Sequence, residues 1–119
     1  MKNMLRNVLT AGAIGLCTIA GHTAAQAEVI RVAVVVADNA ADYANNAALL
    51  PTFAALLRKG TGVKDVYVGS DAAKMTIATT SVWANESDIA SVTGSAEWKA
   101  AAGKLKSKPY TPEVFQITP

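Results

Sequence analysis

The stretch Val29–Ala37, VIRVAVVVA, has the composition of a β-strand with almost no polar face. Many of its residues are β-branched, and β-branched residues favour extended backbone. A strand covered on one side alternates apolar and polar residues, whereas a strand covered on both sides loses that alternation. We therefore expect both faces of this strand to be sheltered from water.

The remaining segments have the periodicities of two helical regions and three more strands. They are a helix over Ala41–Lys59, a strand over Val63–Gly69, a strand over Lys74–Ala84, two short helices within Glu86–Lys106 joined at Thr93–Gly94, and a strand over Glu113–Thr118. Apolar residues at helical spacing indicate the helices, and alternation indicates the strands. The order β-α-β-β-α-β is that of the ferredoxin-like α+β fold, with a four-stranded antiparallel sheet and helices on one face.

Three residues set expectations about how the helices begin or bend. Pro51 lies inside the first helix and removes a backbone hydrogen bond, so we expect a kink or a break there. Asn85 and Ser95 precede the two later helices and are expected to cap them. In the third strand, the period of two places Met75, Ile77, Thr79, Ser81 and Trp83 on one face.

Helices on one face leave the other face of the sheet open, and that face would carry apolar and small side chains. Exposed apolar patches larger than roughly a few hundred Å² normally mark interfaces. The simplest cover is a second copy of the chain related by two-fold symmetry, sheet face against sheet face. We therefore expect a homodimer in which the two sheets together enclose a barrel.

The N-terminal residues have the pattern of a bacterial secretory signal peptide. Lys2 and Arg6 form a positive start, an uncharged apolar run follows, and Ala25–Ala27 supplies small residues before a cleavage site. The apolar run is too short to span a membrane. The sequence therefore predicts a signal peptide over residues 1–27 and a folded domain over residues 28–119. The protein would be periplasmic or secreted, with no stable membrane association after cleavage.

Loss of this segment limits the chemistry of the domain. The chain has one cysteine, Cys17, and one histidine, His22, and both precede the predicted cleavage site. The domain would therefore contain no disulfide, no thiol nucleophile, no imidazole base and no Cys/His zinc site. Its acidic residues lack the spacing of a calcium loop, so no metal is expected.

The predicted domain carries no net charge. The chain has 11 basic and 9 acidic residues, and loss of Lys2 and Arg6 leaves residues 28–119 with equal numbers of each. Proteins that bind nucleic acids usually present a strongly positive surface. A nucleic acid is therefore not an expected partner.

Five short segments carry a resemblance to a known family. They are Ala41–Tyr43 opening a helix, Gly62–Val63 opening a strand, Val82–Trp83 ending one, Ser95–Ala101, and Pro112–Phe115. In their order and spacing they resemble the dimeric α/β-barrel superfamily, and within it the antibiotic-biosynthesis-monooxygenase type of domain. The resemblance implies a homodimer with a small-molecule cavity between sheet and helices in each subunit. Haem-degrading relatives carry a histidine that binds the haem iron at about the position of Ala102. The predicted domain has no histidine there or elsewhere, so no haem is expected, and no other cofactor is expected either.

Six residues are candidates for the pocket: Trp83, Tyr67, Arg31, Tyr43, Asn45 and Asn46. The resemblance implies that the strand-ending tryptophan lines the pocket, where hydrogen-bond donors would stabilise a substrate anion. The candidates also have structural interpretations. Trp83 would be a core aromatic, Tyr67 a half-exposed strand residue, and Arg31 the partner of a carboxylate at the edge of the dimer. Asn45 and Asn46 would be solvated on a helix surface. No pair has the spacing of a catalytic motif, so the catalytic residues stay unassigned.

Three functions stay open at this point. The first is an exported small-molecule-binding domain without catalysis, and the second is a cofactor-independent monooxygenase acting on an aromatic small molecule. The third is a non-catalytic structural dimer whose pocket is filled by its own side chains. The many alanines in the helical segments leave room under the helices, which favours a cavity over a filled core.

Overall fold

The computed structural model describes residues 27–118. Its elements, in chain order, are β1 (Val29–Val36), α1 (Ala40–Arg58), β2 (Val63–Asp71), β3 (Thr76–Trp83), α2 (Glu86–Thr93), α3 (Ala96–Ala102) and β4 (Glu113–Gln116). Each predicted strand and helical region is present, and the element order confirms the predicted ferredoxin-like α+β class. No helix in this part of the chain is both long and apolar enough to cross a membrane.

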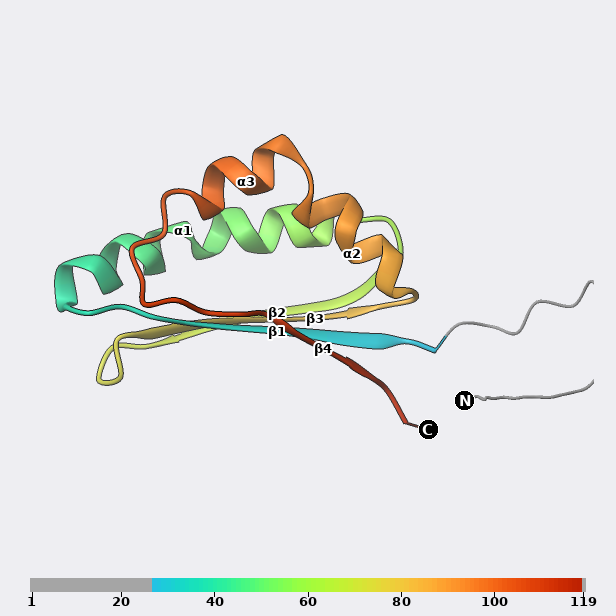
Figure 1. Ribbon diagram of the computed structural model, residues 1–119, viewed down its shortest axis with the longest axis horizontal. Coiled ribbons are helices and arrows are strands. Elements are labelled where there is room, and N and C mark those ends of the chain that lie inside the picture. The colour runs from blue at the N-terminus through green and yellow to red at the C-terminus, as the bar shows by residue number, and fades with distance from the viewer. Residues whose placement is uncertain (1–26, 119) are drawn as a thin grey trace, which may run out of the picture.

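The sheet has four antiparallel strands in the order β2-β3-β1-β4. The strand that opens the domain, β1, is therefore central, with β3 on one side and β4 on the other. All three helices lie on the same side of the sheet, as Figure 1 shows. The helical layer covers one face of β1, so this arrangement accounts for one of the two sheltered faces that the sequence predicts.

The covered side of the sheet carries the core. On β1 and β3 every second residue is buried, and the buried residues face the helices. The larger of two apolar clusters comprises Val29, Phe53, Leu57, Trp83, Ile89, Val92, Trp98 and Ala101, and the smaller comprises Val35, Leu50 and Ile77. The predicted sharing of one face of the third strand is confirmed for Ile77, Thr79, Ser81 and Trp83, and the structure shows that this face is the one that the helices cover. Packing against the helices therefore accounts for one side of the strand pattern.

The opposite side of the sheet is uncovered in the single chain. The register pairs Ile30 with Phe115, while Val34 follows Ile30 at the period of two, so all three side chains share this side. Phe115 is 52% exposed, Val34 48% and Tyr67 63%. These exposed apolar and aromatic side chains, with Val32, Ala78, Thr80 and Val82 between them, form what we call the open face. The open face is rich in apolar side chains, as expected of a surface that a second copy of the chain would bury. Within residues 27–118 of a single chain, nothing else packs against it.

The third strand begins later than predicted. Met75 adopts a positive φ of 52°, so it belongs to the turn after β2 and not to β3, which starts at Thr76. The side chain of Asp71 closes this turn by accepting hydrogen bonds from the backbone N–H groups of Ala73 and Lys74. An aspartate that accepts a hydrogen bond from the backbone N–H two residues later is typical of tight turns. Here the turn includes Lys74 and Met75, which the sequence pattern predicts to be part of the third strand.

Of the two predicted effects of Pro51, a kink or a break, the break is wrong. The helix runs without interruption for 19 residues from Ala40 to Arg58. Asn39 is its N-cap and accepts a hydrogen bond from the backbone N–H of Asp42 at 2.9 Å. Packing of Leu50 and Phe53 into the core on either side of the proline offsets the lost hydrogen bond.

The second helical region divides where the sequence predicts. Between α2 and α3, Gly94 ends the first helix and Ser95 caps the second, accepting a hydrogen bond from the backbone N–H of Trp98 at 3.1 Å. Asn85 occupies the N-cap position of α2, but its side chain makes no capping bond; its amide instead contacts the carboxylate of Asp88. The predicted capping role of the Asn85 side chain is therefore wrong, whereas that of Ser95 is confirmed.

Candidate binding site

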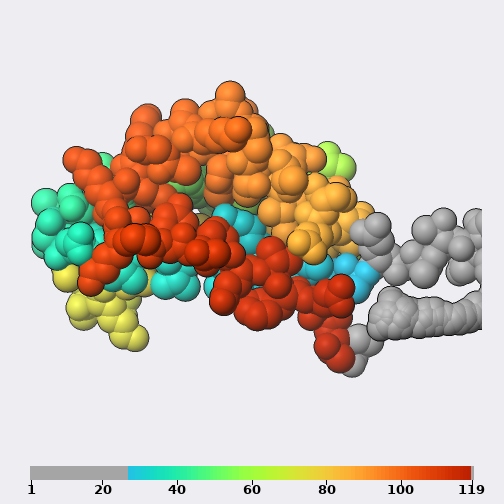
Figure 2. Space-filling model, in the orientation of Figure 1, coloured from blue at the N-terminus to red at the C-terminus, as the bar shows by residue number. Residues whose placement is uncertain are grey.

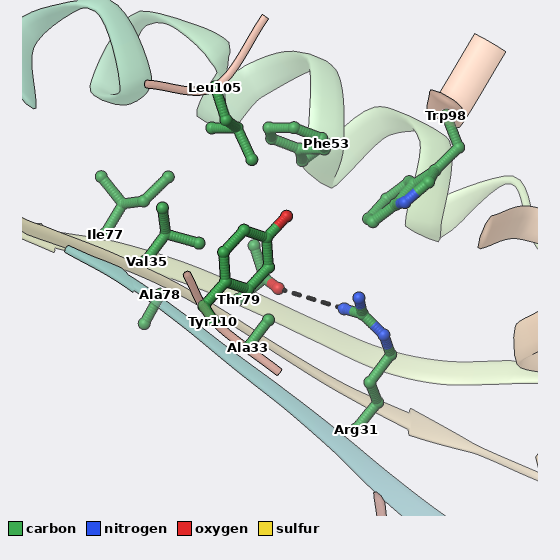
Figure 3. Close-up of a pocket in the computed structure, with 10 residues that line it drawn as sticks. All are labelled: Arg31, Ala33, Val35, Phe53, Ile77, Ala78, Thr79, Trp98, Leu105 and Tyr110. Carbon is green, nitrogen blue, oxygen red and sulfur yellow. Dashed lines mark hydrogen bonds between the residues drawn. The ribbon is translucent and has the colours of Figure 1, made fainter. Parts of the chain in front are cut away.

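A cavity lies between the covered side of the sheet and the helices. Its walls come from β1 (Arg31, Ala33, Val35), β3 (Ile77, Ala78, Thr79), α1 (Phe53), α3 (Trp98) and the segment after α3 (Leu105, Tyr110). Figure 3 shows these residues around one space, with the sheet below and the helices above; only the Ala78 side chain points to the other side of the sheet. Both layers of the domain therefore contribute to its walls.

The cavity is small and open at one side. Counted with its open mouth, the hollow contains about 300 Å³ of empty space, but the part that can enclose a solvent molecule is only about 20 Å³. The smaller volume has room for about one water molecule. A larger ligand would therefore occupy the mouth of the cavity, or would enter as the residues at the mouth move.

Arg31 is the most unusual residue of the cavity. It is only 5% exposed, although arginine is seldom buried without a partner. One guanidinium nitrogen donates a long hydrogen bond of 3.5 Å to the Thr79 hydroxyl, and the guanidinium carbon lies 5.2 Å from the centre of the Trp98 ring. Burial lowers the pKa of Arg31, and the phenol oxygen of Tyr110 acts in the opposite direction. The group stays charged, because arginine does not lose its proton in proteins.

Trp98 is held in place over this cation. It is 9% exposed and packs edge-to-face on Phe53, with ring centroids 5.0 Å apart and planes inclined at 62°. The face of an aromatic ring attracts a cation, and the attraction is stronger away from water. Trp98 and Thr79 together therefore fix the guanidinium at one end of the cavity.

The mouth of the cavity is formed by the segment between α3 and β4, which supplies Leu105 and Tyr110. In the space-filling view this segment, coloured orange to red, lies along the side of the molecule between helices and sheet (Figure 2). It is fastened to the rest of the domain by a backbone hydrogen bond of 2.9 Å from Lys108 N–H to Val36 C=O. Tyr110 is 38% exposed, which places it at the boundary between cavity and solvent.

Asn45 and Asn46 fasten the same segment, and the expectation that both are solvated is wrong. Asn46 is 0% exposed; its Oδ1 accepts from Lys106 N–H at 2.9 Å, and its Nδ2 donates to Lys106 C=O at 3.0 Å. Asn45 donates to the carbonyl oxygen of Lys104 at 2.9 Å. Both side chains thus bind the backbone of the segment after α3, and neither lines the cavity.

Trp83 lies in the core and does not line the cavity. It is 0% exposed, and its indole N–H donates to the Ser81 hydroxyl at 2.7 Å. Because this donor already has a partner, the N–H is not available to a ligand in the cavity. The structure therefore gives Trp83 the packing role that was one of its two sequence interpretations.

The two tyrosines among the candidates also lie away from the cavity. Tyr67 projects from β2 on the open face, where it is largely exposed. Tyr43 lies on α1 and packs, partly buried, against the smaller core cluster. Of the six sequence candidates, only Arg31 therefore lines the cavity, whose walls also include Thr79, Trp98 and Tyr110.

Sequence reasoning had a signal for Thr79 and no signal for Tyr110. The period of two predicts that Thr79 and Trp83 lie on the same face of the third strand, which the structure confirms. Tyr110 lies in a segment without regular structure, so no periodicity indicates where it points. Residues 27–118 contain no group of three or more Asp, Glu, His or Cys side chains that could hold a metal ion.

Comparison with known proteins places this geometry on a known scaffold. No protein-family model and no curated protein matches the sequence. Among solved structures, SnoaB, a cofactor-independent oxygenase from Streptomyces nogalater, matches with a TM-score of 0.65 and 15% identity, covering 78% of this chain and 95% of SnoaB. A proposed antibiotic biosynthesis monooxygenase from Deinococcus radiodurans matches with a TM-score of 0.67 and 18% identity, covering 76% and 93%. Rv0793 from Mycobacterium tuberculosis matches with a TM-score of 0.66 and 15% identity, covering 77% and 96%.

The chain has the fold of these proteins. The resemblance carried by the five short segments is thereby confirmed at the level of the fold. At identities of 15–18% the likeness establishes the scaffold and leaves function to the site.

Replacing Trp83 by phenylalanine tests its packing role. We expect the free energy of unfolding to fall by about 1–3 kcal/mol, because the change removes buried volume and leaves the Ser81 hydroxyl without its partner. Urea denaturation followed by circular dichroism measures the loss. Adding Ser81→Ala to the same variant should recover part of the loss, because no hydroxyl is then left unpaired. A W83F protein as stable as the parent would contradict the placement of Trp83 in the core.

Proposed function

We propose that the protein is a homodimeric small-molecule-binding protein of the bacterial cell envelope or exterior, built on the antibiotic-biosynthesis-monooxygenase type of scaffold. The observation that carries the proposal is the cavity between sheet and helices, which holds a buried arginine at one end and apolar side chains elsewhere. Ligand pockets are commonly apolar concavities with a few convergent polar groups. A structural dimer with a filled interior would have no need of a buried charge there.

Binding without catalysis is the function we favour. Arg31 and Tyr110 are the titratable residues of the cavity wall, and no carboxylate or imidazole among the described residues lines it. General-base catalysis needs an acceptor within hydrogen-bond reach of the substrate proton. Arginine cannot accept a proton, and Tyr110 is partly exposed to solvent, so the cavity offers a cation and no evident base.

A cofactor-independent oxygenase is the second candidate. The likeness of the scaffold to SnoaB favours it, as does the cation, because a substrate that has lost a proton would be stabilised beside Arg31. Because the cavity offers no evident base, the substrate of such an oxygenase would have to be acidic enough to lose its proton to water before it binds. Oxygen consumption with acidic hydroxyaromatic compounds, compared between the parent protein and R31M, distinguishes it from binding alone.

The proposed dimer is supported by the open face. The chain covers one side of its central strands with helices and leaves Val34, Tyr67 and Phe115 exposed on the other. A two-fold partner placed against the same surface would remove these side chains from water on both subunits at once. The helix-side cavity would stay free, because it lies on the opposite side of the sheet.

Native mass spectrometry of protein purified without refolding tests the proposal. We expect the mass of a dimer of residues 28–119, together with additional mass from a bound organic molecule in part of the population. A polypeptide beginning at Glu28 would support the predicted export and cleavage. A monomer that takes up no small molecule from a metabolite mixture would contradict the proposed function.

A further inference from the structure

Arg31 is a buried cation without a counter-ion in the described part of the chain. The ion pairs found there join Lys64 to Glu28 and Lys108 to Asp38, and all four side chains are substantially exposed. Arg31 has the Thr79 hydroxyl at 3.5 Å and the face of Trp98, neither of which carries a negative charge. A buried charge that lacks a partner is strongly destabilising, so residues 27–118 alone do not explain why an arginine stands there.

Three polar groups line the cavity that contains this cation. In Figure 3 the Arg31 guanidinium, the Thr79 hydroxyl and the Tyr110 hydroxyl lie around the cavity, while the other side chains that line it are mainly apolar. A guanidinium has five N–H donors in one plane, and Thr79 takes one of them. The remaining Arg31 donors and the Tyr110 hydroxyl make no side-chain hydrogen bond within the described residues that line this cavity.

We propose that the cavity binds a small monocarboxylic acid with an apolar body, with its carboxylate on Arg31 and its body against Val35, Ile77 and Leu105. This inference rests on the proposed function and names the class of its ligand. The planar fork of arginine matches the two oxygens of a carboxylate, and such charge-assisted pairs are among the strongest hydrogen bonds in proteins. The ligand would supply the negative charge that the protein lacks at this point.

The surroundings of Arg31 favour a single negative charge over a phosphate. Within residues 27–118 no second cation lines the cavity, and its walls away from Arg31, Thr79 and Tyr110 are apolar. A doubly charged phosphate would bring one uncompensated charge into this apolar space, which is unfavourable. A carboxylate neutralises the single charge of Arg31 and leaves a body that the apolar wall can cover.

The cavity has to widen before it can admit an organic ligand. The enclosed part of about 20 Å³ is too small for an organic molecule, whereas the hollow with its mouth contains about 300 Å³. The apolar body would therefore extend toward Tyr110 at the boundary with solvent, and the segment carrying Leu105 and Tyr110 would move to admit it. Benzoate is a probe of suitable size.

Isothermal titration calorimetry with benzoate and with benzamide tests the proposal. The two probes have nearly the same shape, and only benzoate is charged. We expect benzoate to bind about 10- to 100-fold more tightly than benzamide, because hydrogen bonds to a charged group contribute more binding free energy than neutral ones, and affinity depends exponentially on that difference. Arg31→Met should remove this preference, and Thr79→Val should weaken benzoate binding less. Arg58→Met, the same substitution at an exposed arginine of α1, should leave both affinities unchanged.

Thermal unfolding of R31M separates a ligand-binding arginine from a structural one. Methionine retains the linear part of the side chain and has no charge to desolvate, so we expect the Tm of the ligand-free R31M protein to rise by several °C. A structural arginine would instead make the variant less stable.

Each outcome decides a different point. Equal binding of benzoate and benzamide would contradict recognition of a carboxylate by Arg31, but it would agree with a pocket for small molecules. No binding of either probe by a dimeric protein would also overturn the inference. A monomer without binding would overturn the proposed function as well, and a fall in the Tm of R31M would assign Arg31 to the fold.

Discussion

Replacing Val34 by lysine is expected to dissociate the homodimer. Val34 lies on β1, in the centre of the sheet, and is 48% exposed on the open face. In a two-fold interface each substitution occurs twice, so V34K would bury two unpaired ammonium groups between the sheets. An uncompensated buried charge costs about 3–5 kcal/mol. We therefore expect the dissociation constant of the dimer to rise by about 1,000-fold or more.

Size-exclusion chromatography with light scattering measures this effect. The matched control is Ala100→Lys, which adds the same side chain at an exposed position of α3 on the helix side. V34K should elute with the mass of a monomer and A100K with that of a dimer. A dimeric V34K protein with undiminished affinity would show that the open face does not form the interface.

Replacing Asn46 by leucine is expected to destabilise the domain strongly. Asn46 is fully buried and binds both the N–H and the C=O of Lys106. Leucine has the same branched arrangement of heavy atoms but makes neither bond, so two backbone groups would lose their partners. Each unsatisfied group costs about 1–3 kcal/mol, and we expect the free energy of unfolding to fall by about 2–4 kcal/mol. For a domain of this size the Tm would fall by roughly 10–20 °C.

The same substitution should affect the cavity, because the segment that Asn46 fastens carries Leu105 and Tyr110. Hydrogen exchange followed by mass spectrometry should show faster exchange in residues 104–110 of N46L than in the same residues of the parent. Asn45→Ala is the control: at a half-buried site it removes the bonds from Asn45 Nδ2 to Lys104 C=O and to Asn46 Oδ1, leaves both bonds between Asn46 and Lys106 in place, and should cost at most about 1 kcal/mol. If N46L and N45A were equally stable, the fastening role of Asn46 would be wrong.

The fold was largely predictable because its signals are local. The period of two in β3, the apolar run of β1 and the capping serine before α3 each follow from a few neighbouring residues. Two wrong predictions concern the start of β3 and the continuity of α1, where contacts of individual side chains determine the backbone conformation. Asp71 closes a turn that carries Met75 out of β3, and the packing of α1 on the sheet keeps the helix whole through Pro51. Neither effect is visible in apolar periodicity.

The site was much less predictable because its residues meet only in three dimensions. Arg31 and Thr79 are 48 positions apart in the sequence, and Asn46 and Lys106 are 60 apart. The sequence drew attention to aromatic and amide side chains but not to their partners. Trp83 finds its partner two residues away in Ser81 and so belongs to the core, whereas Trp98 faces the buried cation. Burial and pairing decide these roles.

Thiol labelling at the open face tests the central claim most directly, namely that a second copy of the chain covers the side of the sheet that the helices leave bare. Val34→Cys, in a Cys17→Ser background, introduces a single thiol at a position that is 48% exposed in one chain. Alkylation of this thiol should be much slower than alkylation of the thiol in an Ala100→Cys variant, and it should quicken on dilution as the dimer dissociates. Equal rates for the two variants, independent of protein concentration, would show that the open face is in contact with water and would contradict the account.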